Sequence, residues 1–171
     1  MLISKKVNDA INQQVGNEFG ASLQYVSIAT YLSEEGLIEL SSFFYKQSEE
    51  EREHAMRFVK FVVDSGGKLK IPGIAAPRSS FKQVIEALEL SLNWEREVTA
   101  QITALYALAV KENDYVSQNF LSWFIKEQLE EVSTMDTLVK VAQRAKDNLL
   151  FLEEFVARHG DKLRAGEESE G

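Results

Sequence analysis

Ionisable side chains interrupt the apolar pattern of this sequence at a few regularly placed positions. Glu51 and His54 form a Glu-x-x-His sequence, whose i, i+3 spacing places both side chains on one face of a helix. Glu18, Glu95 and Glu131 interrupt three other helical stretches in the same way. Carboxylates with one imidazole and no thiolate form a ligand set for iron, manganese or zinc. These residues therefore indicate a metal centre.

Each of these stretches has one inward face when it is read in alternating steps of three and four residues. The faces are apolar at their ends and polar near their middles, so exposing the polar groups would also expose the flanking apolar ones. The first two faces are Ile11, Val15, Glu18, Ser22, Tyr25, Ala29, Leu32 and Phe44, Gln47, Glu51, His54, Phe58, Phe61. The other two are Leu88, Leu92, Glu95, Thr99, Ile102, Tyr106, Ala109 and Leu121, Phe124, Gln128, Glu131, Met135, Leu138.

The first two faces correspond to the last two at a constant shift of 77 residues. The polar positions that this shift relates are Glu18 and Glu95, Glu51 and Gln128, and His54 and Glu131. Two helix pairs related by a pseudo-twofold axis would bring these positions together at the centre of a bundle. Buried carboxylates repel one another and are costly to desolvate. Since no Lys or Arg lies on the four faces, the remaining remedies are protonation of the carboxylates or insertion of cations.

Breaks in the helical pattern define the expected elements. Helix-forming residues dominate long stretches between sparse Gly, Asn and Asp positions, while both prolines, Pro72 and Pro77, fall in one segment. Ser80 and Gln83 have capping-box spacing after that segment. The expected helices are 5–35, 38–65, 80–112, 114–145 and a short fifth at 148–158. The predicted fold is an all-α four-helix bundle with one long crossover connection.

Composition limits the class of protein. The 171 residues suit one domain, expected over 1–160, followed by a disordered acidic tail over 161–171. A net charge of −8 disfavours nucleic acid and anionic lipid as partners. The absence of cysteine excludes a disulfide framework and thiolate ligands. The N-terminus does not read as a signal peptide, and no stretch is apolar enough to span a membrane, so a cytoplasmic location is expected.

Over about residues 5 to 160 the sequence resembles the bacterial and archaeal non-haem ferritins. The segments that carry the resemblance are 17–25, 50–56, 94–99 and 119–131. The resemblance implies a ferritin-like bundle with a short fifth helix, assembled as a homo-oligomeric hollow shell of 24 subunits. It also implies oxidation of Fe(II) by O₂ or peroxide at a di-iron ferroxidase centre, with storage of the product as ferric oxide mineral.

The resemblance also implies roles for individual residues. Glu18, Glu51 and His54 resemble ligands of the first iron, and Glu51 would bridge to a second iron completed by Glu95 and Glu131. Three further side chains resemble an amide and two aromatic residues beside the centre: Gln128, Tyr25 and Trp123. A third iron site resembles that of prokaryotic ferritins, with the expected ligands Glu50, Glu127 and Glu130 and with Glu131 shared.

The sequence departs from the related bacterioferritins in two places. Those proteins have Glu-x-x-His in both halves, whereas the second half here has Gln128-x-x-Glu131. They also place a haem-ligating Met just after the second-helix Glu, where this chain has Arg52. We therefore expect no haem.

Three other functions use the same residues. A non-shell di-iron or di-manganese oxidoreductase would act on an organic substrate with the same ligands. A binding-only protein would hold metal without turnover. A purely structural bundle would use the central polar layer as a hydrogen-bond network. The mass of the particle and its consumption of oxygen would distinguish these functions.

Overall fold

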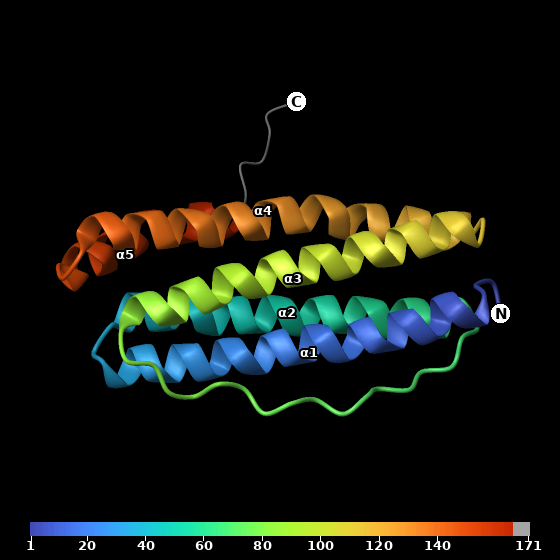
Figure 1. Ribbon diagram of the computed structural model, residues 1–171, viewed down its shortest axis with the longest axis horizontal. Helices are drawn as coiled ribbons and strands as arrows, with labels where there is room; N and C mark the ends of the chain where they lie inside the picture. The colour runs from blue at the N-terminus through green and yellow to red at the C-terminus, as the bar shows by residue number, and fades with distance from the viewer. Residues whose placement is uncertain (166–171) are drawn as a thin grey trace.

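The computed structural model describes residues 1–165, which form five helices. Their bounds are α1 Lys5–Glu34, α2 Ile38–Asp64, α3 Val84–Lys111, α4 Tyr115–Ala145 and α5 Leu149–Ala165. The four long helices lie side by side as a bundle, and α5 folds back at one end of α4 (Figure 1). The predicted all-α bundle is confirmed, and α1 to α4 begin and end within a few residues of the predicted bounds.

The helices begin at caps of different kinds. The side chain of Ser4 accepts a hydrogen bond from Val7 N at the start of α1, and Asp114 does the same for Ser117 N at the start of α4. The predicted capping box at 80–83 is wrong. Gln83 is the N-cap residue of α3, has extended backbone and makes no side-chain cap bond, so the helix begins at Val84.

The crossover between α2 and α3 runs the length of the bundle beside α1 (Figure 1). Buried amides of α1 bind backbone groups of the crossover at two places. Lys68 N donates to Asn8 Oδ1 at 3.0 Å, and Asn12 Nδ2 donates to the Lys68 carbonyl at 2.8 Å. Gln24 pairs with both the N–H and the carbonyl of Arg78, each at 2.9 Å. These bonds hold a segment that has no secondary structure of its own.

A glycine of α1 allows the crossover to approach this helix closely near its middle. A Cβ atom added at Gly16 would lie 2.3 Å from Pro72 Cγ, well inside contact distance. At Gly20, one turn along the same helix, the nearest atoms would be 3.8 Å away. Gly16 therefore determines how closely the crossover docks.

The core is divided into two apolar clusters with a polar layer between them. One cluster is centred on residues such as Tyr25, Phe44 and Met135, and the other on residues such as Phe58 and Phe124. All four predicted inward faces are buried, apart from three half-buried members: Phe61, Thr99 and Tyr106. The polar members of those faces make up the layer between the clusters.

Helix α5 is longer than the predicted 148–158, and its last five residues belong to the segment expected to be a disordered tail. Residues 161–165 are therefore helical, a correction to the predicted domain boundary, while 166–171 lie outside the described residues. The α4–α5 corner turns at Lys146, whose φ of 53° and ψ of −119° are rare for a residue with a side chain. None of the described helices is long and apolar enough to cross a membrane.

Candidate metal centre

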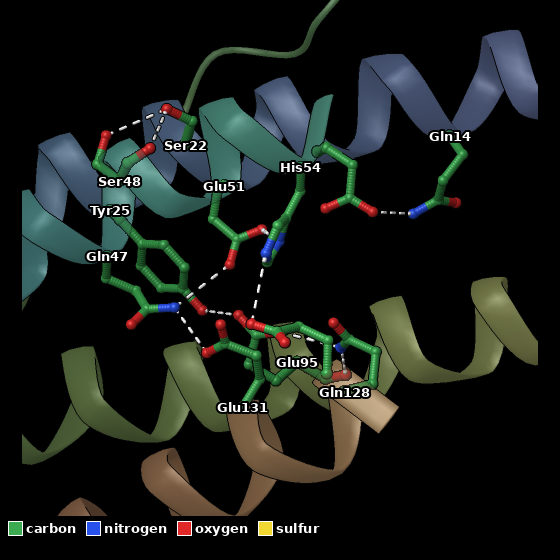
Figure 2. A network of polar contacts seen from close by, with 12 residues as sticks. Gln14, Ser22, Tyr25, Gln47, Ser48, Glu51, His54, Glu95, Gln128 and Glu131 are labelled. Carbon is green, nitrogen blue, oxygen red and sulfur yellow. Dashed lines mark hydrogen bonds and ion pairs between the residues drawn. The ribbon is translucent and has the colours of Figure 1, made fainter. Parts of the chain in front are cut away.

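All four long helices contribute to one buried group of candidate metal ligands (Figure 2). Glu18 comes from α1, Glu51 and His54 from α2, Glu95 from α3 and Glu131 from α4. Each of these residues is at most 6% exposed. The sequence predicted that these five residues converge, and the structure brings them together.

The ligand atoms form two groups that share Glu51. One oxygen each of Glu18 and Glu51 lies with a His54 nitrogen in a group whose atoms are all within 4.8 Å of one another. Oxygens of Glu51, Glu95 and Glu131 form a second group of the same kind. The shared carboxylate is in position to bridge two cations.

Each residue of the first group has one buried side-chain atom without a hydrogen-bond partner among residues 1–165: Glu18 Oε2, Glu51 Oε2 and His54 Nδ1. His54 Nδ1 lies 3.4 Å from Glu51 Oε2 without forming a hydrogen bond. Leaving such atoms unsatisfied in a protein interior costs roughly 1–3 kcal/mol each. Their lone pairs suit a divalent cation, so the donor set fits iron.

Neighbouring amides hold the other oxygens of two carboxylates. Gln14 Nε2 donates to Glu18 Oε1 at 2.7 Å, and Gln47 Nε2 donates to Glu131 Oε2 at 2.6 Å. Gln47 Nε2 also lies 3.4 Å from Glu51 Oε1 (Figure 2). These bonds orient the carboxylates, as outer-shell partners do in metal sites.

Glu95 is held through both of its oxygens. The Tyr25 hydroxyl donates to Oε1, and Gln128 Nε2 lies 3.2 Å from Oε2. The same Gln128 nitrogen is 3.2 Å from the Glu95 carbonyl and from Thr99 Oγ1. Two of the three residues predicted beside the centre, Tyr25 and Gln128, therefore contact the same candidate ligand, Glu95.

Burial dominates the electrostatics of the centre. It raises the pKa of Glu18, raises the pKa values of Glu51 and Glu131 well above their ordinary range, and raises that of Glu95 to about 7. Burial alone would lower the pKa of His54, but the neighbouring carboxylates outweigh it and raise that pKa to about 11. Without metal the centre therefore retains protons, which a cation must displace.

The residues predicted for a third iron are only partly brought together. Oxygens of Glu127 and Glu131 lie with a His54 nitrogen in a group within 4.8 Å, and Glu127 Oε1 is 3.7 Å from His54 Nε2. The close-donor groups found within residues 1–165 include neither Glu50 nor Glu130. Both are half-buried, and Glu50 pairs with Arg164.

Trp123 lies beside the centre, as predicted, with its ring 5.6 Å from that of His54. The Trp123 ring also contacts Arg57, whose guanidinium lies 4.0 Å from the ring centroid.

Sequence reasoning missed the parts played by Gln14, Gln47 and Arg164. Gln14 and Gln47 each lie four residues before a candidate ligand glutamate, a spacing that places side chains together on a helix, so their contacts with Glu18 and Glu51 were accessible from the sequence. The shorter contact of Gln47 with Glu131, 84 residues away, was not. No comparable sequence signal existed for Arg164. Its contact with Glu50 depends on how α5 packs.

Comparison with known proteins agrees with this geometry. The ferritin-like domain family matches residues 8–145. The chain is 46% identical to "Ferritin BfrB" of Mycobacterium tuberculosis over 91% of this chain and 86% of that protein. It is 32% identical to a "Bacterial non-heme ferritin" of Staphylococcus aureus over 90% of this chain and 93% of that one.

Solved structures show the same fold. An open pore ferritin from the archaeon Archaeoglobus fulgidus superposes with a TM-score of 0.88 at 31% identity, covering 91% of this chain and 97% of the other. The match extends over the four helices that carry the candidate ligands and over most of both chains. The chain therefore belongs to the ferritin family.

Proposed function

We propose that this protein is an iron-storage ferritin that oxidises Fe(II) at a di-iron centre within each subunit. Glu18, Glu51 and His54 would bind one Fe(II), and Glu51, Glu95 and Glu131 the second. The observation that carries the proposal is the Glu51 carboxylate, which belongs to both groups of close donor atoms. A single bridging ligand holds two ions near each other, and the rest of each group completes a separate site.

Two adjacent Fe(II) ions supply two electrons together, which matches the two-electron reduction of O₂ to hydrogen peroxide. A coordination shell made mainly of carboxylates stabilises Fe(III) more than Fe(II), so it favours loss of the electron. Tyr25 and Gln128 keep Glu95 in place, and Gln47 keeps Glu131 in place. The protons that the carboxylates and His54 hold without metal leave as iron binds.

The finer features of the family belong to this proposal as well. We infer a shell of 24 subunits in the cytoplasm, whose cavity takes the ferric oxide. A third ion would use Glu127 and Glu131, with Glu50 and Glu130 nearby. Arg52 stands where a haem-ligating Met would be needed, so the proposal includes no haem.

The test combines oxygen consumption after addition of Fe(II) with the mass of the particle in the same sample. Rapid uptake by a particle of about 24 subunits is the expected result. Uptake by a monomer or dimer would favour an oxidoreductase acting on an organic substrate. Oxygen uptake no faster than with free iron would overturn the ferroxidase assignment and leave a binding or structural site.

A further inference from the structure

The end of α5 is fixed against the bundle at the level of the metal centre. Thr134 Oγ1 of α4 donates to the Leu163 carbonyl at 2.7 Å, and Lys46 of α2 pairs with Asp161 at 3.1 Å. The buried Gly160 lies against Phe43 of α2, at the 3.5 Å distance of an ordinary contact from an added Cβ. These contacts determine where the last turn of α5 directs its side chains.

That last turn places Arg164 on Glu50. Arg164 Nη1 is 2.9 Å from Glu50 Oε1, and the two side chains are only 17% and 31% exposed. Arg164 Nε is buried and has no hydrogen-bond partner within residues 1–165. The guanidinium keeps its charge at any physiological pH, and it has lost much of its water, so Glu50 is its main compensation.

Glu50 directly precedes the bridging Glu51 and is the carboxylate predicted to help bind a third ion. The guanidinium pairs with one oxygen of the carboxylate that such an ion would need. The other close-donor group at this side of the centre, formed by His54, Glu127 and Glu131, contains no Lys or Arg. Arg164 therefore competes with a metal ion for one ligand only.

We propose that Arg164 is a positioning residue that holds Glu50 away from a third metal ion, so that the centre binds two ions tightly and a third only in competition with the end of α5. This inference rests on the proposed di-iron function. It makes α5 a determinant of metal stoichiometry, although the ligands of the two principal ions all lie on α1 to α4.

The test is anaerobic calorimetric titration of the assembled, metal-free protein with Fe(II). Wild type should bind two ions per subunit tightly and a third weakly. Arg164→Gln should strengthen binding of the third ion by about tenfold, equivalent to about 1.4 kcal/mol, and leave the first two unchanged. Arg164→Lys keeps the charge and should stay close to wild type.

Two controls separate competition from damage to α5. Arg158→Gln removes an exposed arginine of the same helix, paired with Glu154, and should change no binding step. Arg164→Gln combined with Glu50→Gln should lose the gain, because the freed ligand is gone. Particle mass and thermal midpoint should match wild type in every variant.

The outcomes distinguish the inference from the function on which it rests. If wild type fails to bind two ions tightly, the proposed di-iron centre is wrong. If two ions bind normally and Arg164→Gln leaves the third unchanged, the role of Arg164 is wrong. A gain that persists when Glu50 is also replaced would equally overturn it.

Discussion

The place of Glu51 in both groups of close donor atoms gives the sharpest prediction at the scale of single residues. Glu51→Ala should abolish rapid Fe(II) oxidation without preventing assembly, because it removes a ligand from both groups at once. The metal-free variant should be at least as stable as wild type, since one buried carboxylate is gone. Stopped-flow oxidation and particle mass would measure both effects.

The control for this variant is Glu49→Ala, which removes an exposed glutamate two residues earlier on α2. It should oxidise iron at the wild-type rate. Rapid oxidation by Glu51→Ala itself would contradict the di-iron assignment.

Glu95 gives a prediction about pH. Its pKa in the folded protein is about 7, against an ordinary value of 4.5, because it is buried. Between pH 4.5 and about pH 7, the folded protein keeps the Glu95 proton while the unfolded chain has lost it. The free energy of unfolding of the metal-free protein therefore falls as pH rises through this range. The loss attributable to Glu95 is up to about 3 kcal/mol. His54, with its pKa raised, adds a further loss above its ordinary pKa of 6.5.

Thermal midpoints of the metal-free protein at pH 5 and pH 8 test this prediction. Wild type should have the lower midpoint at pH 8, and Glu95→Gln should show a smaller difference between the two. Glu97→Gln, an exposed position on the same helix, should behave as wild type. An equal pH difference in Glu95→Gln would show that Glu95 does not retain its proton.

At the scale of elements, α5 completes the start of α2. Leu37, the N-cap residue of α2, offers no side-chain cap bond, and Glu153 of α5 instead accepts from the backbone N–H groups of Glu39 and Leu40, each at 2.9 Å. Glu153→Ala should cost about 1 kcal/mol, as loss of an N-cap does. The expected signs of this loss of stability are faster amide exchange at Glu39 and Leu40 and a lower thermal midpoint.

Glu154→Ala is the matched control, because Glu154 is exposed and pairs only within α5 to Arg158 among the described residues. It should leave exchange at the start of α2 unchanged. Equal effects from the two variants would show that the inter-helix cap contributes nothing.

The features that could be predicted from the sequence are those that depend on the local pattern of apolar and polar residues. The four inward faces follow from periodicity, and the ligands follow from the places where that periodicity is interrupted. The length of α5 did not follow, because three of the five residues 161–165 are charged and the segment is helical where Thr134 and Lys46 hold it. The ion pair of Arg164 with Glu50 joins residues 114 apart, and no spacing rule links such positions.

At the scale of the whole molecule, the crossover joins the two helix pairs and lies along the entire bundle (Figure 1). Its docking depends on Gly16. Gly16→Ala should displace Pro72 and destabilise the protein by about 1–3 kcal/mol, despite the better helix propensity of alanine. A lower thermal midpoint and faster proteolysis within the crossover would be the signs.

Gly20→Ala is the control in the same helix. Its new methyl group would lie at an ordinary contact distance of 3.8 Å, so propensity alone should stabilise the helix by up to about 1 kcal/mol. If both alanines stabilised the protein, Gly16 would not determine how the crossover docks.

The corner at Lys146 shows where this molecule can gain stability. Glycine adopts that backbone conformation without the steric cost that a side chain brings, so Lys146→Gly should raise the free energy of unfolding by about 1 kcal/mol, measurable as a higher thermal midpoint. An unchanged or lower midpoint would show that the corner carries no strain.

The two principal groups of candidate ligands lie on other residues, so oxidation kinetics should not change in Lys146→Gly. Such a variant would give the protein mutational tolerance: a background that absorbs the cost of destabilising substitutions, so that the chemistry of the centre can be altered without losing the fold.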